Sequence, residues 1–130
     1  DSRRKICVED LVVAETFNDY ETTFRVVTEA IDRYPRLRGI YMANLSVSGC
    51  AAAIEQAGKK GAIRLICHDL NESVRQLLLR GSIDFTIPQN LRQQGYGPLI
   101  LLRDVLRRKA VPDAARFNRQ IDIVCSDNLP

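Results

Sequence analysis

The sequence lacks any apolar run that approaches the roughly 18 residues a membrane-spanning helix needs. Its opening stretch, DSRRKICVED, lacks the apolar region of a secretory signal peptide. It also lacks internal repeats and low-complexity segments. Across its 130 residues, 45% are hydrophobic and 27% are charged, which is typical of a soluble globular protein. We therefore expect one compact domain of ordinary size with no membrane association.

Metal-binding and redox motifs are also missing. Cys7, Cys50, Cys67 and Cys125 form no C-x-x-C pair, and the sequence has a single histidine, His68. Zinc needs clustered ligands, so we expect no metal site and no cofactor. Cys67 and Cys125 lie in apolar runs and are expected to be small buried residues. Free buried thiols suit a reducing compartment and favour a cytoplasmic location.

The sequence contains no recognisable catalytic constellation. His68 and Asp69 are neighbours in an extended run, so their side chains should point to opposite faces of a sheet. Ser46 and Ser48 lack the G-x-S-x-G setting of a nucleophilic serine. The strand ends lack the acidic cluster and lysine of a phospho-receiver. We therefore expect a protein that is not an enzyme.

Charge gives little indication of a polyanionic partner. The net charge is +3 and the pI is near 8.8. The basic clusters at 3–5 and 107–109 are not interleaved with aromatic residues and lie in no recognisable helix-turn-helix. We expect both clusters to be solvated, without a nucleic-acid interface in this chain.

Short apolar runs alternate with segments of helical periodicity. The helical segments are expected at about 19–34, 46–58, 71–79 and 91–109. This alternation predicts an α/β fold with a mostly parallel sheet and helices on both faces. The helix at 91–109 is long, and the predicted sheet has few strands for it to cover. It can therefore pack on a protein surface outside this chain. The apolar runs, each predicted to be a strand, are LVVAE (11–15), GIYMA (39–43), IRLIC (63–67), IDFTI (83–87) and QIDIVC (120–125).

A polar or aromatic residue follows each of the first four runs. These residues are Tyr20, Asn44, Asp69 and Gln89. In open parallel sheets, ligands bind outside the carboxyl ends of the strands. One ring, two amides and one carboxylate suit a hydroxyl-rich small molecule. Other roles stay open: a helix cap for Asp69, turns or caps for both amides, and a core position for Tyr20. Asp84 lies near a strand start and is expected to be structural.

The segment LICHDLNESVRQLLLRGSIDFTIPQNLRQQGY resembles the late part of the effector-binding domain of LacI/GalR-type transcription regulators. That domain shares its fold with type I periplasmic sugar-binding proteins. ETFNDYETTFRVVTEAIDRYPRLRGIYMAN upstream and IDIVCSDNLP downstream extend the resemblance over residues 11–130. The positions that carry it are Asp69, Gly81, Ile83, Asp84, Ile87 and Gln89.

This resemblance implies a periplasmic-binding-protein-like, two-lobed domain. Residues 1–90 and 119–130 would form its carboxyl-terminal lobe, and 91–118 would belong to an amino-terminal lobe otherwise absent here. It implies a sugar, or a related polyol or nucleoside, bound between the lobes by the four rim residues. It further implies a homodimeric regulator whose operator DNA contacts a headpiece outside this chain. The alternative is a periplasmic substrate-binding protein of a sugar ABC transporter, which the unpaired cysteines disfavour.

Overall fold

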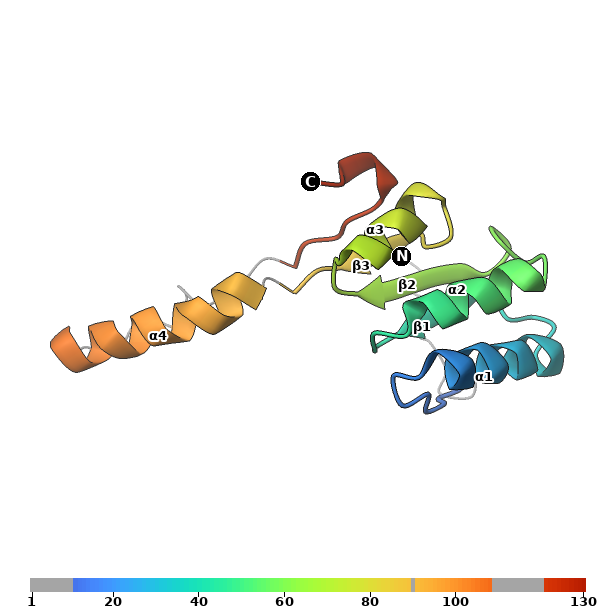
Figure 1. The fold of residues 1–130 in the computed structure, drawn as a ribbon, viewed down its shortest axis with the longest axis horizontal. Helices are drawn as coiled ribbons and strands as arrows, with labels where there is room; N and C mark the ends of the chain where they lie inside the picture. The colour runs from blue at the N-terminus through green and yellow to red at the C-terminus, as the bar shows by residue number, and fades with distance from the viewer. Residues whose placement is uncertain (1–10, 90, 109–120) are drawn as a thin grey trace, which may run out of the picture.

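A three-stranded parallel sheet and the helices between its strands form the centre of the molecule. The computed structural model describes residues 11–89, 91–108 and 121–130. The strands lie in the order β1-β2-β3, which confirms the predicted α/β fold (Figure 1). In chain order the elements are α1 (Tyr20–Arg33), β1 (Gly39–Met42), α2 (Val47–Gln56), β2 (Arg64–His68), α3 (Glu72–Leu79), β3 (Phe85–Ile87), α4 (Leu91–Arg108) and a 3-10 helix, η3 (Ser126–Asn128).

The register of the strands brings their carboxyl ends to one edge of the sheet. Met42 pairs with Cys67 at the end of the β1–β2 ladder. The β2–β3 ladder continues one residue further, to the pair of His68 and Ile87. We call this edge, together with the loops that follow the three strands, the rim. The arrow of β2 points towards the rim, on the side where α4 leaves the sheet (Figure 1).

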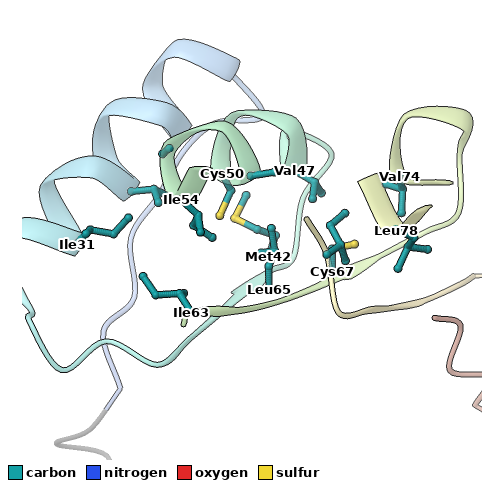
Figure 2. Packing of buried hydrophobic residues seen from close by; sticks show 14 of the residues in the cluster. Ile31, Met42, Val47, Cys50, Ile54, Ile63, Leu65, Cys67, Val74 and Leu78 are labelled. Atoms are coloured by element: carbon teal, nitrogen blue, oxygen red, sulfur yellow. The ribbon is translucent and has the colours of Figure 1, made fainter. Parts of the chain in front are cut away.

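The core lies on one face of the sheet. In β2, Leu65 and Cys67 are buried, whereas Ile66 and His68, which point to the other face, are partly exposed. Helices α1, α2 and α3 all pack over the face of Leu65 and Cys67 (Figure 2). No helix of the described residues covers the opposite face, so the second helix layer predicted from the sequence is not found in these ranges. The residues labelled in the cluster of Figure 2 are Ile31, Met42, Val47, Cys50, Ile54, Ile63, Leu65, Cys67, Val74 and Leu78.

Local signals in the sequence set the helix boundaries. The Asp19 side chain caps α1 by accepting a hydrogen bond from the Thr22 N–H at 2.8 Å. Gly81, with φ of 66°, follows α3 in the left-handed conformation that commonly ends a helix. The apolar faces of α1, α2 and α3 are the ones that meet the sheet.

The strand predicted at 11–15 is absent. Leu11, Val12 and Val13 are exposed, and no backbone ladder involves them. The chain that follows is instead anchored by side chains beyond the end of β1. Asn44 donates to Thr16 at 2.6 Å, and Asn18 accepts from the Leu45 N–H at 2.9 Å. The apolar run alone was therefore insufficient, because within the described ranges β1 pairs with β2 and with no other segment.

The prediction of a strand at 120–125 is wrong over its described residues, 121–125. Only Val124 pairs with the sheet, through one antiparallel bridge to Thr86. The Asn128 side chain competes for the neighbouring backbone, since it accepts from Cys125 N at 2.7 Å and donates to Ile123 O at 2.9 Å. Cys125 is consequently only partly buried, and not a core residue as the sequence suggested.

Helix α4 projects away from the sheet and its three covering helices (Figure 1). It confirms the helix predicted there, with Pro98 inside it, and its Leu99, Leu102 and Leu106 are exposed. None of the helices in the described ranges has the length and hydropathy to cross a bilayer. The predictions for 1–10, 90 and 109–120 fall outside those ranges; they include Cys7, the whole basic cluster at 3–5 and Lys109 of the second basic cluster.

Candidate functional site

Asp69 occupies the central position of the rim, directly after β2. Its φ of 65° lies in the left-handed region, which is uncommon for a residue with a side chain. Two contacts from β3 hold it there. The Asp69 N–H donates to the Ile87 carbonyl at 3.1 Å, and the Thr86 hydroxyl donates to the Asp69 carbonyl at 2.5 Å. Strained backbone of this kind concentrates at ligand-binding positions.

The Asp69 carboxylate is not used by the fold. Its Oδ1 atom is buried and has no hydrogen-bond partner among the described residues. The alternative role of a helix cap belongs to Asn71, whose side chain accepts from the Val74 N–H at 2.9 Å. An unsatisfied buried acceptor is rare in folded proteins. Oδ1 of Asp69 therefore keeps its hydrogen-bond acceptor capacity unused within the described residues.

Asn44 lies on the same edge but is committed to its own loop. Its Nδ2 donates to the Thr16 hydroxyl, and its Oδ1 accepts from the Ser46 N–H at 3.2 Å and the Ser46 hydroxyl at 3.0 Å. Ser46 in turn bonds Thr23 of α1 at 2.6 Å. These contacts fit the turn-forming role considered for Asn44. Only one N–H of its amide is left for a ligand.

Tyr20 and Gln89 are both exposed near the rim. Tyr20 begins α1, and its ring stacks on Phe24 with centroids 6.4 Å apart. Gln89 follows Pro88 just after β3, and its side chain bonds to none of the described residues. Tyr20 is 44% exposed, so it is not the core residue considered as its alternative role. Both side chains are thus accessible at the surface.

Asp84 is structural, as the sequence predicted. Its two oxygens bond Arg64 at 2.6 Å and the Leu65 N–H at 2.8 Å. This places it at the amino ends of β2 and β3, away from the rim. The two carboxylates, Asp69 and Asp84, therefore serve different ends of the sheet.

A hydrogen-bonded pair near the rim escaped the sequence reasoning. The Tyr41 hydroxyl bonds Nε2 of His68, and the two rings meet edge to face at 5.3 Å. Nδ1 of His68 is buried and has no partner among the described residues. Strand alternation could have placed both side chains on one face, but it gives no sign that they touch.

A hollow of about 580 Å³ borders the rim on the side of the carboxyl-terminal segment. It is lined by Leu70, Pro88, Ile121, Ile123, Val124 and Pro130, among others. None of the four predicted site residues lines it. The hollow also has Asp122 and Asn128 in its lining, but we place the candidate site at Asp69 because the residues that follow the strands lie on the rim.

The thiols close to the site are inert. Burial raises the pKa of Cys50 to about 12, with a further contribution from Cys67. Burial also raises the pKa of Cys67, and the Asp69 carboxylate adds to that shift. Neutral buried thiols make poor nucleophiles and poor metal ligands. In the described ranges no three His, Cys, Asp or Glu side chains are grouped so that they could share a metal ion.

Known proteins with this architecture bind sugars. In sequence, the chain is 30% identical over 89 residues to the D-allose-binding periplasmic protein of Escherichia coli (strain K12), covering 67% of this chain and 29% of that protein. In structure, it matches GanP, a glucose-galactose binding protein from Geobacillus stearothermophilus, with a TM-score of 0.76 at 19% identity over 89% of this chain and 41% of GanP.

An ABC transporter solute-binding protein from Agrobacterium vitis, bound with alpha-D-tagatopyranose, matches with a TM-score of 0.74 and 28% identity. The match covers 91% of this chain and 39% of that protein. The chain thus spans well under half the length of these relatives. The family model described as "Periplasmic binding protein domain" matches residues 3–110. The chain therefore belongs to the periplasmic binding protein family, whose members bind ligands and do not catalyse reactions.

Proposed function

We propose that this chain is one lobe of a sugar-binding protein that presents its ligand to an ABC transporter. The relatives named above support transport more than the transcriptional role expected from the sequence. The sugar would lie between this lobe and a second one. The rim would supply one wall of that cleft.

Asp69 is the observation that carries the proposal. Its carboxylate has an unpartnered buried oxygen, and its backbone is held in a left-handed conformation by β3. A carboxylate accepts hydrogen bonds from adjacent hydroxyls with fixed geometry. Gln89 and Tyr20, both exposed, would add an amide and an apolar ring surface. Asn44 would contribute its remaining N–H.

Helix α4 supports the division into lobes. Leu99, Leu102 and Leu106 are exposed on a helix that projects from the rest of the described chain (Figure 1). An apolar stripe of this kind calls for a partner surface. In our proposal, residues 91–118 belong to the second lobe, whereas 1–90 and 119–130 belong to this one. A cleft with one wall would bind sugar weakly, because partial burial forfeits most of the affinity.

Calorimetric titration of the full-length protein with D-allose, D-tagatose, D-glucose and D-galactose tests the proposal. We expect one of these sugars to bind, and Asp69→Asn to weaken that binding about tenfold or more, since charge-assisted hydrogen bonds are strong. Asp32→Asn is the matched control, because Asp32 is an exposed carboxylate of α1 outside the rim. Equal affinity in the wild type and Asp69→Asn would contradict the proposal.

A LacI-type regulator is the second candidate, favoured by the free thiols. Cys50 and Cys67 are unpaired and buried, which suits a reducing cytoplasm. In that case sugar binding would shift a homodimer between states that do and do not bind operator DNA. Cell fractionation separates the candidates: recovery of the full-length protein in the exported fraction supports transport, and cytoplasmic recovery together with DNA binding supports the regulator.

A further inference from the structure

The end of β2 is held unequally by its two neighbouring strands. On the β3 side, the ladder continues to His68 and is followed by the two hydrogen bonds to Asp69. On the β1 side, the ladder stops at the pair of Met42 and Cys67. On the β1 side, no rung of the described residues reaches Asp69 itself.

A side-chain bridge adds a second link between β1 and the end of β2. Met42 and Cys67 point into the helix-covered core, so Tyr41 and His68 point to the opposite face. There the Tyr41 hydroxyl bonds Nε2 of His68, and the ring planes cross at 76°. The bridge joins β1 to the last residue of β2, directly before Asp69.

The bridge also couples the imidazole tautomer to the hydroxyl. When the Tyr41 hydroxyl donates, Nε2 accepts and the ring proton lies on Nδ1. Nδ1 has no partner among the described residues, and Tyr41 is thus the only described side chain that fixes the ring through a hydrogen bond. Removal of the Tyr41 hydroxyl would release both the ring orientation and the tautomer.

We propose that Tyr41 and His68 are positioning residues that hold Asp69 in its ligand-binding geometry by linking the end of β2 to β1. This inference rests on the proposed role of Asp69 in sugar binding. Neither residue needs to touch the ligand. Their effect reaches it through the backbone between His68 and Asp69, which β3 holds from the other side.

Sugar affinities of Tyr41→Phe, His68→Phe and the double variant test the proposal. They are measured in the full-length protein by calorimetric titration with the sugar that binds the wild type most tightly among the four named above. We expect each single variant to bind about two- to tenfold more weakly, the range that loss of one neutral hydrogen bond gives. The double variant should be no weaker than the weaker single variant, because both changes remove the same bond.

Tyr34→Phe is the matched control. Tyr34 lies after α1, its ring is covered by Arg33, and its hydroxyl bonds to none of the described residues. We expect its affinity to equal that of the wild type. A lower melting temperature with unchanged affinity in Tyr41→Phe and His68→Phe would overturn the positioning role and leave only a structural bridge. Fully additive affinity losses would overturn it too.

Nitrogen-15 NMR of the imidazole gives an independent readout. His68 is the only histidine in this sequence, and its signals are identified by their loss in His68→Phe. We expect the Nδ1–H form in the wild type and a mixture of tautomers in Tyr41→Phe. A mixture of tautomers in the wild type would contradict the hydrogen bond between Tyr41 and His68. Failure of the wild type to bind any sugar would instead contradict the proposed function itself.

Discussion

The α-carbon of Gly49 lies directly against the backbone of Tyr20. A Cβ atom at Gly49 would come within 2.7 Å of the Tyr20 carbonyl oxygen and 3.3 Å of the Thr23 Cβ. The first turn of α1 and the first turn of α2 therefore touch at Gly49, which has no side chain to keep the two backbones apart. This contact sets how closely Tyr20 approaches the loop that carries Asn44.

Gly49→Ala should lower the free energy of unfolding by about 1–3 kcal/mol, because the added methyl group has no space against a helix backbone. Chemical denaturation followed by circular dichroism measures this. Gly95→Ala is the control, since a Cβ at Gly95 of α4 would meet no atom within 4 Å. Alanine is the better helix former there, so stability should not fall. An unchanged unfolding midpoint for Gly49→Ala would contradict the close contact.

Asp69→Gly should separate stability from ligand binding. Glycine adopts the φ of 65° without steric cost, so the variant should gain up to about 1 kcal/mol of stability. The backbone bonds from Ile87 and Thr86 remain, because they involve no side-chain atom of Asp69. Sugar binding should nevertheless be lost with the carboxylate. Thermal unfolding and titration on the same samples provide both numbers, and retained affinity would argue against Asp69 as a ligand.

Asp84→Asn should give the opposite result. The substitution weakens the bonds to Arg64 and the Leu65 N–H, and we expect a loss of about 1–2 kcal/mol in stability. Sugar affinity measured well below the melting temperature should be unchanged. A large fall in affinity would place Asp84 in the binding machinery, contrary to its position at the amino ends of the strands.

Alkaline pH should destabilise the fold through Cys50. Its folded pKa is raised from 9.0 to about 12, so the folded state holds the thiol proton more tightly than the unfolded state. The stability linked to this thiol is fully present below pH 9.0 and is lost as the pH rises towards about 12. Urea unfolding across that window measures the slope. Cys50→Ala should flatten it, and an equal slope in both proteins would contradict the assignment.

The helices were largely predictable, because their signals are local. The predicted segments 19–34 and 71–79 form α1 and α3, which Asp19 and Asn71 cap, and Gly81 takes a left-handed turn after α3. For two further segments, the sequence could not decide between a strand and a loop. Residues 11–15 and 121–125 have strand-like composition, but strand formation depends on a neighbouring edge that the local pattern does not contain.

The candidate site was predictable in place but less so in detail. The edge on which Asp69 and Gln89 lie follows from the alternation of strands and helices. The bond from Asn44 to Thr16 does not, since it joins residues far apart in sequence, whereas the contact of Asn44 with Ser46 is a local turn. The contact of Tyr41 with His68 depends on the register of β1 and β2, which no motif encodes. The ligand-binding roles of the four rim residues stay predictions.

The left-handed backbone at Asp69 restricts which amino acids this position accepts. Glycine, asparagine and aspartate tolerate such a φ, whereas β-branched residues are strongly disfavoured. In a saturation library, a screen for folded protein should therefore return a short set of residues. A screen for sugar binding should reduce this set of residues further, towards aspartate. Folding and sugar binding would then select independently on the same codon.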